Sequence, residues 1–269
     1  MLLLLQPIGV YPYIGPPETV AESRYMAPSD HDCPLSRKLR THMPLARADL
    51  AILADLHARR RTYPAGADMI FEGQAAHPLY ILYEGWASSY KLLADGTRQI
   101  LDFQIPGDSL GLNSMLFQTA DHNIEPITDI VASEIIIGDV AGFYASSPTL
   151  ATALLWAAAR DQAMVVEHLI NVGRRDAQRR TAHFLLELGA RLILVGRGTR
   201  QGYDCPLSQY LLADALGLTA EHTNRVLRQL RQDGLVTFRD GRVVFDDLEG
   251  LIKLADFDMG YLDHGVLLR

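Results

Sequence analysis

Residues 216–225 read LGLTAEHTNR, and this stretch decides the fold of the C-terminal part of the chain. A tight Gly-Leu-Thr turn at residues 217–219 separates two segments whose apolar residues recur at helical spacing. The first helix is expected to begin after Ser208, whose side chain can cap it. The second is expected to run from Ala220 to about Asp233, where a glycine ends it. The stretch therefore predicts two helices joined by a tight turn.

A β-hairpin is expected directly after the second helix. Residues 235–238 and 242–245 are short β-branched and aromatic runs, and Asp-Gly at 240–241 is a hairpin signal between them. A further helix is expected upstream, over residues 176–195. Two helices with a tight turn, followed by a hairpin, are typical of a winged helix-turn-helix, which we assign to residues 176–250.

Charge is distributed unevenly along the chain. The 269 residues carry a net charge of −7, which taken whole argues weakly against nucleic-acid binding. Residues 174–245, however, contain twelve arginines and seven acidic residues, a net of +5, and leave −12 for the rest. The basic segment coincides with the expected helix-turn-helix, so the charge pattern supports DNA binding by this part.

The second helix is expected to present one charged face. Glu221, Arg225 and Arg228 step by four and three residues on the face opposite its apolar residues. Arginine can donate two hydrogen bonds to guanine, and glutamate can accept one from cytosine. The alternative is that Glu221 and Arg225 form a surface ion pair, worth about 0.3–0.5 kcal/mol. The expected DNA-binding residues are Ser208, Thr219, Glu221, His222, Asn224, Arg225, Arg228, Arg239 and Arg242.

Short strands separated by glycine turns dominate an earlier region. A helix is expected over residues 35–61, and strands over 69–71, 79–83, 86–93, 99–103 and 129–139. Such spacing is typical of a small antiparallel β barrel or sandwich. We assign residues 31–147 to this domain, which makes the chain an α+β protein. Residues 1–30 are expected to be a flexible extension and residues 251–269 a C-terminal tail.

Residues 148–175 are expected to form one long helix that ends in a hinge. Its apolar residues step by 4, 3, 4, 3, 4 and 3, which is a heptad pattern and favours a dimer seam. The alternative is a helix packed on its own domain. The seam residues are Ala151, Leu155, Ala158, Gln162, Val165, Leu169 and Val172.

The chain resembles the Crp/Fnr family of bacterial transcription regulators over roughly residues 35–250. The β-rich part has Glu-Gly at 72–73, LYILYEG at 79–85 and PGDSLG at 106–111, which look like the family's β-roll. The long helix and residues 216–225 resemble its dimerisation helix and recognition helix. The resemblance implies an N-terminal antiparallel β-roll similar to a cyclic-nucleotide-binding domain, a long dimerisation helix and a C-terminal winged helix-turn-helix. It also implies that Glu221 and Arg225 are the pair that contacts bases.

The chain departs from the pattern of the cAMP-binding members. The resemblance places an effector pocket at Gly107, Asp108, Gly111, Leu112, Asn123, Val165 and Val166. The glutamate after the second turn glycine is Leu112 here, and no Arg-Ser pair stands in residues 123–126. Glu125 would repel a cyclic phosphate, so no tight cAMP binding is expected. An unknown small-molecule effector stays open.

Metal sites and cofactors are not predicted. An iron–sulfur cluster of the Fnr kind needs four cysteines, and the chain has only Cys33 and Cys205. Two cysteines are also too few for a disulfide framework, which favours a reducing compartment, the cytoplasm. His77 and His168 are weak haem candidates, because neither has a recognisable supporting pattern.

The predicted function is a homodimeric, sequence-specific regulator on a palindromic operator. Its partners would be double-stranded DNA, a second copy of the chain and, as the resemblance implies, RNA polymerase. No segment is long and apolar enough for a membrane span, and no catalytic motif is present, so neither a membrane partner nor enzyme activity is expected. The alternative is a sensor module whose basic domain binds a protein partner.

Overall fold

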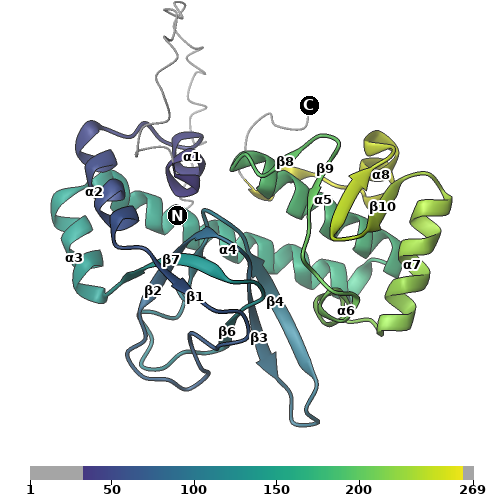
Figure 1. The fold of residues 1–269 in the computed structure, drawn as a ribbon, viewed down its shortest axis with the longest axis horizontal. Helices are drawn as coiled ribbons and strands as arrows, with labels where there is room; N and C mark the ends of the chain where they lie inside the picture. The colour runs from purple at the N-terminus through teal and green to yellow at the C-terminus, as the bar shows by residue number, and fades with distance from the viewer. Residues whose placement is uncertain (1–32, 263–269) are drawn as a thin grey trace, which may run out of the picture.

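The computed structural model describes residues 33–262. The predicted N-terminal extension, residues 1–30, and the last seven residues of the predicted tail lie outside this range. Two connected parts are visible: a β-roll with flanking helices, and a mostly helical part that carries a small sheet (Figure 1). The long helix α4 (Pro148–Arg174) runs lengthwise from the first part towards the second.

The β-roll consists of two antiparallel sheets. One has the order β1-β7-β2-β5, from β1 (Arg61–Tyr63), β7 (Ile130–Ile135), β2 (Leu79–Glu84) and β5 (Ser109–Leu110). The other has the order β4-β3-β6, from β4 (Arg98–Gln104), β3 (Ala87–Leu92) and β6 (Asn123–Pro126). Gly85 turns the chain between β2 and β3 with a φ of 80°, and a Cβ there would lie 2.3 Å from the Asp129 carbonyl oxygen. Only glycine fits at this turn.

Three helices pack against the β-roll. They are α1 (Pro34–Arg40), α2 (Arg47–Ala58) and α3 (Ile137–Ser146), and they share an apolar core with β2 and the start of α4. Asp49 on α2 accepts hydrogen bonds from the Ala46 amide and the Ser147 hydroxyl, so one carboxylate fastens the start of α2 to the start of α4.

The C-terminal part contains the expected winged helix-turn-helix. Its helices are α5 (Ala177–Leu194), α6 (Gln209–Leu216), α7 (Ala220–Gln232) and α8 (Leu248–Ala255), followed by a 3-10 turn, η1 (Met259–Leu262). Its sheet has the order β10-β11-β9-β8, from β10 (Val236–Arg239), β11 (Arg242–Phe245), β9 (Gly202–Asp204) and β8 (Gly198–Thr199).

One apolar core crosses the boundary between the two parts. It joins Phe103 and Ile100 of the β-roll to Phe184 and Leu216 of the helical part. The rings of Phe103 and Phe184 lie 5.8 Å apart in an edge-to-face arrangement. The DNA-binding part is therefore packed against the β-roll in this conformation.

Three sequence predictions in the β-rich part are corrected. The helix expected over 35–61 is two helices, because Pro44 lies between α1 and α2 and cannot donate a helical hydrogen bond. The strand expected over 69–71 is a single bridge between Ile70 and Ile124. The strand expected over 129–139 stops at Ile135, because Asp139 accepts from the Ile136 amide and starts α3.

The predicted C-terminal tail is also wrong over the residues described. Residues 251–262 form the rest of α8 and η1, and Leu251, Ala255 and Leu262 are fully buried. Leu262 packs with Met164 of α4 and Ala190 of α5. This segment is therefore part of the folded core and holds α4 against α5.

Candidate nucleic-acid interface

The turn between α6 and α7 is built by backbone geometry and a side-chain cap. Gly217 takes the left-handed conformation, with φ 62° and ψ 41°, which a residue with a Cβ rarely adopts. The Leu218 amide donates to the Ala213 carbonyl at 3.0 Å. The Thr219 hydroxyl accepts from the His222 amide at 3.2 Å and starts α7. The residues of the quoted stretch thus fix the angle at which α7 leaves α6.

The apolar face of α7 packs inward, as expected from its spacing. Thr223 and Leu230 are fully buried, Val226 is 6% exposed, and Leu227 is half-buried. They pack with Leu212 and the other apolar residues of the core that α6 contributes to. The opposite face of α7 is consequently turned to solvent.

The exposed face of α7 carries Glu221, Arg225 and Arg228. Among residues 33–262, none of the three side chains forms a salt bridge, so the surface ion pair between Glu221 and Arg225 is not formed. The pKa of Glu221 is lowered, because its carboxylate accepts from its own backbone amide and from the Thr219 hydroxyl. It is ionised at neutral pH and can accept a hydrogen bond from a base amino group.

The β10–β11 hairpin, which is the wing of the domain, adds two arginines that face each other. The β10–β11 hairpin turns at Asp240 and Gly241, both with positive φ, and its register places Arg239 opposite Arg242. Like charges directly opposite in a sheet repel each other, and both side chains are exposed. Binding of an anionic backbone would remove this repulsion, which suits a phosphate contact.

The other predicted DNA-binding residues lie along the same region. Ser208 caps α6, and its hydroxyl accepts from the Leu211 amide at 3.2 Å. Thr219 is exposed, and His222 and Asn224 are half-buried on the first turns of α7. Each predicted residue therefore sits on α7, at a helix start or on the wing.

Arg180 lies at the hinge and makes contacts that the sequence did not reveal. Its Nη1 donates to the Leu216 carbonyl at 2.6 Å, and its Nη2 donates to the Val172 and Arg175 carbonyls at 2.9 and 3.2 Å. One guanidinium thus joins the end of α4 to the end of α6. The start of α5, just before Arg180, is capped by Asp176, whose carboxylate accepts hydrogen bonds from two amides of α5.

A second contact joins α6 to the β-roll. The Arg98 Nε lies 2.8 Å from the Asp214 carboxylate, and both side chains are about one-third exposed. The Gln99 side chain donates to the carbonyls of Asp214 and Ala215. The first helix of the helix-turn-helix is therefore tied both to the hinge and to β4.

A buried group of charged residues joins the two parts from within. We call it the junction cluster, and its members are Lys38, Asp102, Asp108, Arg160, His168, Glu187 and Arg191.

Arg191 of α5 is the centre of the junction cluster. It is 1% exposed, and its guanidinium lies 2.9 Å from the Asp102 carboxylate and 2.7 Å from that of Asp108. The Lys38 Nζ lies 2.7 Å from the other Asp108 oxygen. Burial by itself would raise the pKa of Asp108, but Lys38 and the two arginines hold it well below its usual range.

His168 and Glu187 form the second half of the cluster. Their side chains lie 2.9 Å apart, and Tyr261 donates to the other Glu187 oxygen at 2.7 Å. Burial opposes charge on both, yet their attraction prevails and sets the pKa of His168 to about 9 and that of Glu187 to about 2. His168, considered from sequence as a haem ligand, is thus a partner in an ion pair.

The junction cluster also brings together Asp102, His168 and Glu187, whose ligand atoms lie within 4.8 Å of one another. Such a set resembles a metal site in composition. However, Arg191 forms salt bridges to both Asp102 and Glu187, so its guanidinium supplies the positive charge there. A divalent cation would be repelled by it, and these residues do not fit a metal ion.

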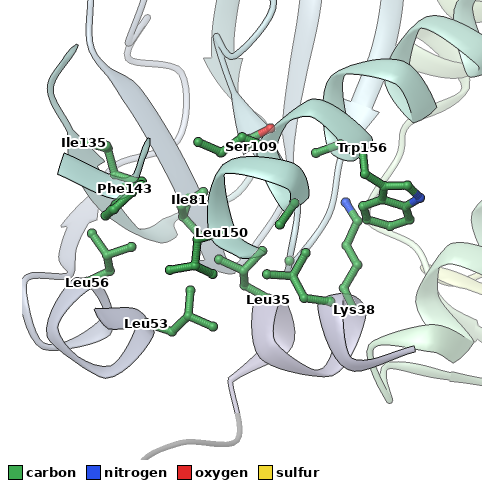
Figure 2. Close-up of a pocket in the computed structure, with 15 residues that line it drawn as sticks. Leu35, Lys38, Leu53, Leu56, Ile81, Ser109, Ile135, Phe143, Leu150 and Trp156 are labelled. Atoms are coloured by element: carbon green, nitrogen blue, oxygen red, sulfur yellow. The ribbon is translucent and has the colours of Figure 1, made fainter. Parts of the chain in front are cut away.

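A small apolar cavity and a larger one lie near the predicted effector region. The smaller is apolar, about 40 Å³, and lies between α1, α2, β2 and α4, with Leu35, Leu53, Leu150 and Trp156 among its lining residues (Figure 2). Its volume is about that of one or two water molecules. The larger, about 580 Å³, lies between the β-roll and α4, and we call it the α4 cavity.

The structure brings only some of the predicted effector-pocket residues together. Gly111, Leu112 and Val165 line the α4 cavity.

Four of the predicted pocket positions do not line the α4 cavity and are corrected. Asp108 is held in the junction cluster, and Gly107 borders the small apolar cavity. Asn123 accepts from the Glu72 amide at 3.0 Å, and Val166 points to solvent.

The predicted dimer seam is mostly exposed along α4. Leu155, Leu169 and Val172 are 62%, 72% and 43% exposed, and Val165 is 47% exposed. Ala151 is 6% exposed and packed inside its own domain, so it is wrongly placed in the seam. Gln162 is exposed and Ala158 half-buried. An apolar stripe therefore lies uncovered on the C-terminal half of α4.

Comparison with protein families gives two matches. Residues 60–147 match the cyclic nucleotide-binding domain, and residues 179–254 match the Crp-like helix-turn-helix domain. No helix of the described residues is long and apolar enough to cross a membrane.

Individual relatives agree with the family matches. The nitrogen fixation regulation protein FixK of Rhizobium meliloti is 31% identical over 185 residues, which cover 68% of this chain and 80% of that protein. FixK of Bradyrhizobium diazoefficiens is 29% identical over 230 residues, covering 85% and 95%. The structure of FixK2 from Bradyrhizobium japonicum aligns with a TM-score of 0.66 and 28% identity, covering 72% of this chain and 96% of that one.

These matches decide between the two functions expected from sequence, since the relatives are regulators with the same helix-turn-helix. They favour DNA binding over a protein-binding role for the basic domain. The β-roll, the long helix, the exposed face of α7 and the relatives together show that the chain is a DNA-binding transcription regulator of the Crp/Fnr family.

Proposed function

We propose that this regulator binds a palindromic operator as a homodimer, with α7 of each copy in a major groove. Arg225 would donate two hydrogen bonds to a guanine, and Glu221 would accept one from a cytosine amino group. Arg228 and the wing arginines would contact phosphates. The observation that carries this proposal is the exposed face of α7, whose charged side chains have no salt-bridge partner among residues 33–262.

The test of this contact is the variant Arg225→Ala. The binding sites of the purified wild-type protein are first identified by genomic footprinting. Arg225→Ala should lose sequence preference, by about 1–3 kcal/mol per half-site, and keep weaker, salt-sensitive binding. Arg40→Ala removes the same charge from an exposed site on α1 and should bind like the wild type. An unchanged footprint at unchanged affinity for Arg225→Ala would show that α7 does not contact the bases.

The dimer is supported by the uncovered stripe on α4. An exposed apolar patch on a folded domain marks a site of association, and here it follows a heptad spacing. Leu169→Lys places a charge in its centre and should shift the protein to a monomer in sedimentation experiments, with a loss of operator affinity. Leu116→Lys changes a residue that is 79% exposed off this helix and should leave the oligomeric state unchanged. A dimeric Leu169→Lys protein would place the interface elsewhere.

The regulator is also proposed not to respond to cAMP. Neither lysine nor arginine is among the residues that line the α4 cavity, and its two histidines, His122 and His168, are already paired with carboxylates, so the lining offers no free cation for a cyclic phosphate. Isothermal titration calorimetry should give no binding at micromolar cAMP. A micromolar affinity would overturn this part of the proposal.

The remaining parts of the proposed function follow from a role in transcription. We propose that the protein acts in the bacterial cytoplasm, contacts RNA polymerase at its promoters and carries out no catalysis. Transcription with purified RNA polymerase, on templates with and without a footprinted site, tests the contact. Dependence of transcript yield on both the site and the protein is the expected result.

A further inference from the structure

The exposed face of α7 carries a neutral polar side chain among its charged ones. Asn224 lies three residues after Glu221, directly before Arg225 and four residues before Arg228, so helical spacing places it beside them. A recognition helix contacts base edges from its N-terminal residues, and Asn224 lies in the second turn of α7. The helix itself lies at the outer edge of the helical part (Figure 1). Asn224 is therefore placed within the part of α7 that contacts bases.

The side-chain amide of Asn224 has no partner within residues 33–262. Asn224 is half-buried, yet neither its Oδ1 nor its Nδ2 takes part in a hydrogen bond there. By contrast, the Gln229 amide further along the same helix donates to the Asp233 carboxylate at 2.8 Å. The Asn224 amide thus keeps both its acceptor and its donor available for a ligand.

The local structure of α7 gives no reason for an asparagine at this position. Asparagine is a weaker helix former than alanine and is favoured at helix starts, where its oxygen caps backbone amides. The start of α7 is capped by Thr219 instead, and Asn224 lies inside the helix without a bond to the backbone. The residue therefore weakens the helix slightly, and a contact outside the protein would account for it.

A free amide matches one base edge in the major groove. Its oxygen accepts and its N–H donates side by side, and adenine presents an N6 amino donor beside its N7 acceptor. Guanine offers two acceptors, cytosine offers a donor alone, and thymine offers an acceptor beside a methyl group. Adenine is thus the base that satisfies both atoms of the amide at once.

The neighbours of Asn224 limit where that adenine lies. Arg225 follows directly, so the two Cα atoms are about 3.8 Å apart. Base pairs of B-DNA are spaced by about 3.4 Å along the helix axis. Glu221 lies one helical turn earlier on the same face. The base opposite Asn224 is therefore expected within about two base pairs of the guanine proposed for Arg225.

We propose that Asn224 recognises an adenine in each half-site of the operator. Its Nδ2 donates to adenine N7 and its Oδ1 accepts from the N6 amino group. The half-site then contains an A·T pair close to the base pairs that Glu221 and Arg225 contact. This inference rests on the proposed function, because it assigns a further base to the same helix.

The test removes single acceptor atoms from the footprinted operator. The Arg225 guanine is identified first, as the one whose replacement by 7-deazaguanine weakens binding of the wild type but not of Arg225→Ala. Each adenine within two base pairs of it is then replaced by 7-deazaadenine, which lacks N7 but keeps its base pairing. Fluorescence anisotropy should show a loss of about fivefold per half-site at one of these adenines for the wild type, and no loss there for Asn224→Ala.

Two variants complete the experiment. Asn224→Ala should bind the unmodified operator about fivefold to 150-fold more weakly per half-site, the effect of one bidentate base contact. Its urea unfolding should show no loss of stability, because alanine is the better helix former. Gln118→Ala removes an exposed amide from the β-roll and should bind every duplex as the wild type does.

Three outcomes would overturn the assignment of Asn224. They are unchanged operator binding by Asn224→Ala, an operator with no adenine in the window, and an Asn224→Ala protein that still responds to 7-deazaadenine as the wild type does. The last result, with equal weakening on all duplexes, would place Asn224 on a phosphate. If Arg225→Ala has meanwhile lost its response to 7-deazaguanine, only Asn224 is misassigned. If Arg225→Ala keeps the wild-type footprint and affinity, the proposed function fails as well.

Discussion

The exposed face of α7 and the junction cluster use the same residue types under opposite conditions. On α7, Glu221 and Arg225 are exposed and have no salt-bridge partner among the described residues. In the junction cluster, Glu187 and Arg191 are four residues apart on α5, are fully buried and lie 3.7 Å from each other. The same i, i+4 spacing thus leaves two charges free for the proposed DNA contact in one helix and packs the domains together in the other.

The difference shows that solvation decides what a charge does. A buried charge needs partners, so each acidic oxygen of the cluster is held by a cation or a hydroxyl. An exposed charge pays little for being unpaired and stays available for a ligand. Changes to the cluster should therefore affect stability, and changes to α7 should affect affinity.

The largest effect is expected for Arg191→Leu. The substitution leaves Asp102, Asp108 and Glu187 without their shared guanidinium, and breaking a buried ion pair costs about 3–5 kcal/mol of unfolding free energy. Urea denaturation followed by circular dichroism measures the loss. Arg197→Leu, at an exposed position just after α5, should stay within about 0.5 kcal/mol of the wild type. A loss below about 1 kcal/mol for Arg191→Leu would show that the cluster does not hold the domains together.

The His168–Glu187 pair predicts a decline of stability at alkaline pH. The pKa of His168 is raised from 6.5 to about 9 in the folded protein, so its contribution is complete below pH 6.5 and is lost as the pH rises through 9. The expected loss of unfolding free energy between pH 6 and 9.5 is about 1–3 kcal/mol. Glutamine does not titrate, so in His168→Gln the loss of unfolding free energy between pH 6 and 9.5 that comes from this pair should vanish in urea unfolding. The same decline in wild type and variant would contradict the pairing.

Glu221→Ala should change base preference without changing stability. Wild type should favour its operator over one with the contacted C·G pair exchanged by about 1–3 kcal/mol, and the variant should lose that discrimination. Fluorescence anisotropy with the two duplexes measures the difference. Urea unfolding should move by no more than about 0.5 kcal/mol, because the side chain is exposed. Glu249→Ala, exposed on α8, is the charge-matched control, and equal discrimination by Glu221→Ala would remove Glu221 from the interface.

The smallest effect is expected at Arg98, in the contact that joins β4 to α6. Its salt bridge to Asp214 is partly exposed, so Arg98→Gln should cost only about 0.2–1 kcal/mol. The end of α6 should nevertheless exchange its amide hydrogens faster, because this contact ties α6 to β4. Hydrogen-exchange mass spectrometry detects the change, with Arg59→Gln as a control at a similarly exposed pair. Unchanged protection of α6 would mean that the apolar core alone holds it.

Local signals in the sequence predicted the DNA-binding part well. The glycine turn, the cap at Thr219 and the apolar spacing of α7 act within a few residues of one another, so their outcome depends little on the rest of the chain. The Asp240-Gly241 hairpin formed as predicted.

Long-range packing explains what the sequence did not predict. Residues 256–262 lack a strong local pattern of their own, and they became part of the core by contact with α4 and α5. Arg191 and Asp108 are 83 residues apart, and no spacing rule relates them. The effector-pocket positions failed at Asp108 because a motif gives a residue's place in the chain but not the partners that surround it.

The sequence by itself determined the winged helix-turn-helix, the face of α7 that carries Glu221 and Arg225, and the glycine turns of the β-roll, because these depend on local backbone preference and periodicity. Only the tertiary structure decided which charges are buried in the junction cluster and which remain free on α7. Burial and pairing depend on segments that are distant in the chain, and the free energy of a charge depends on both.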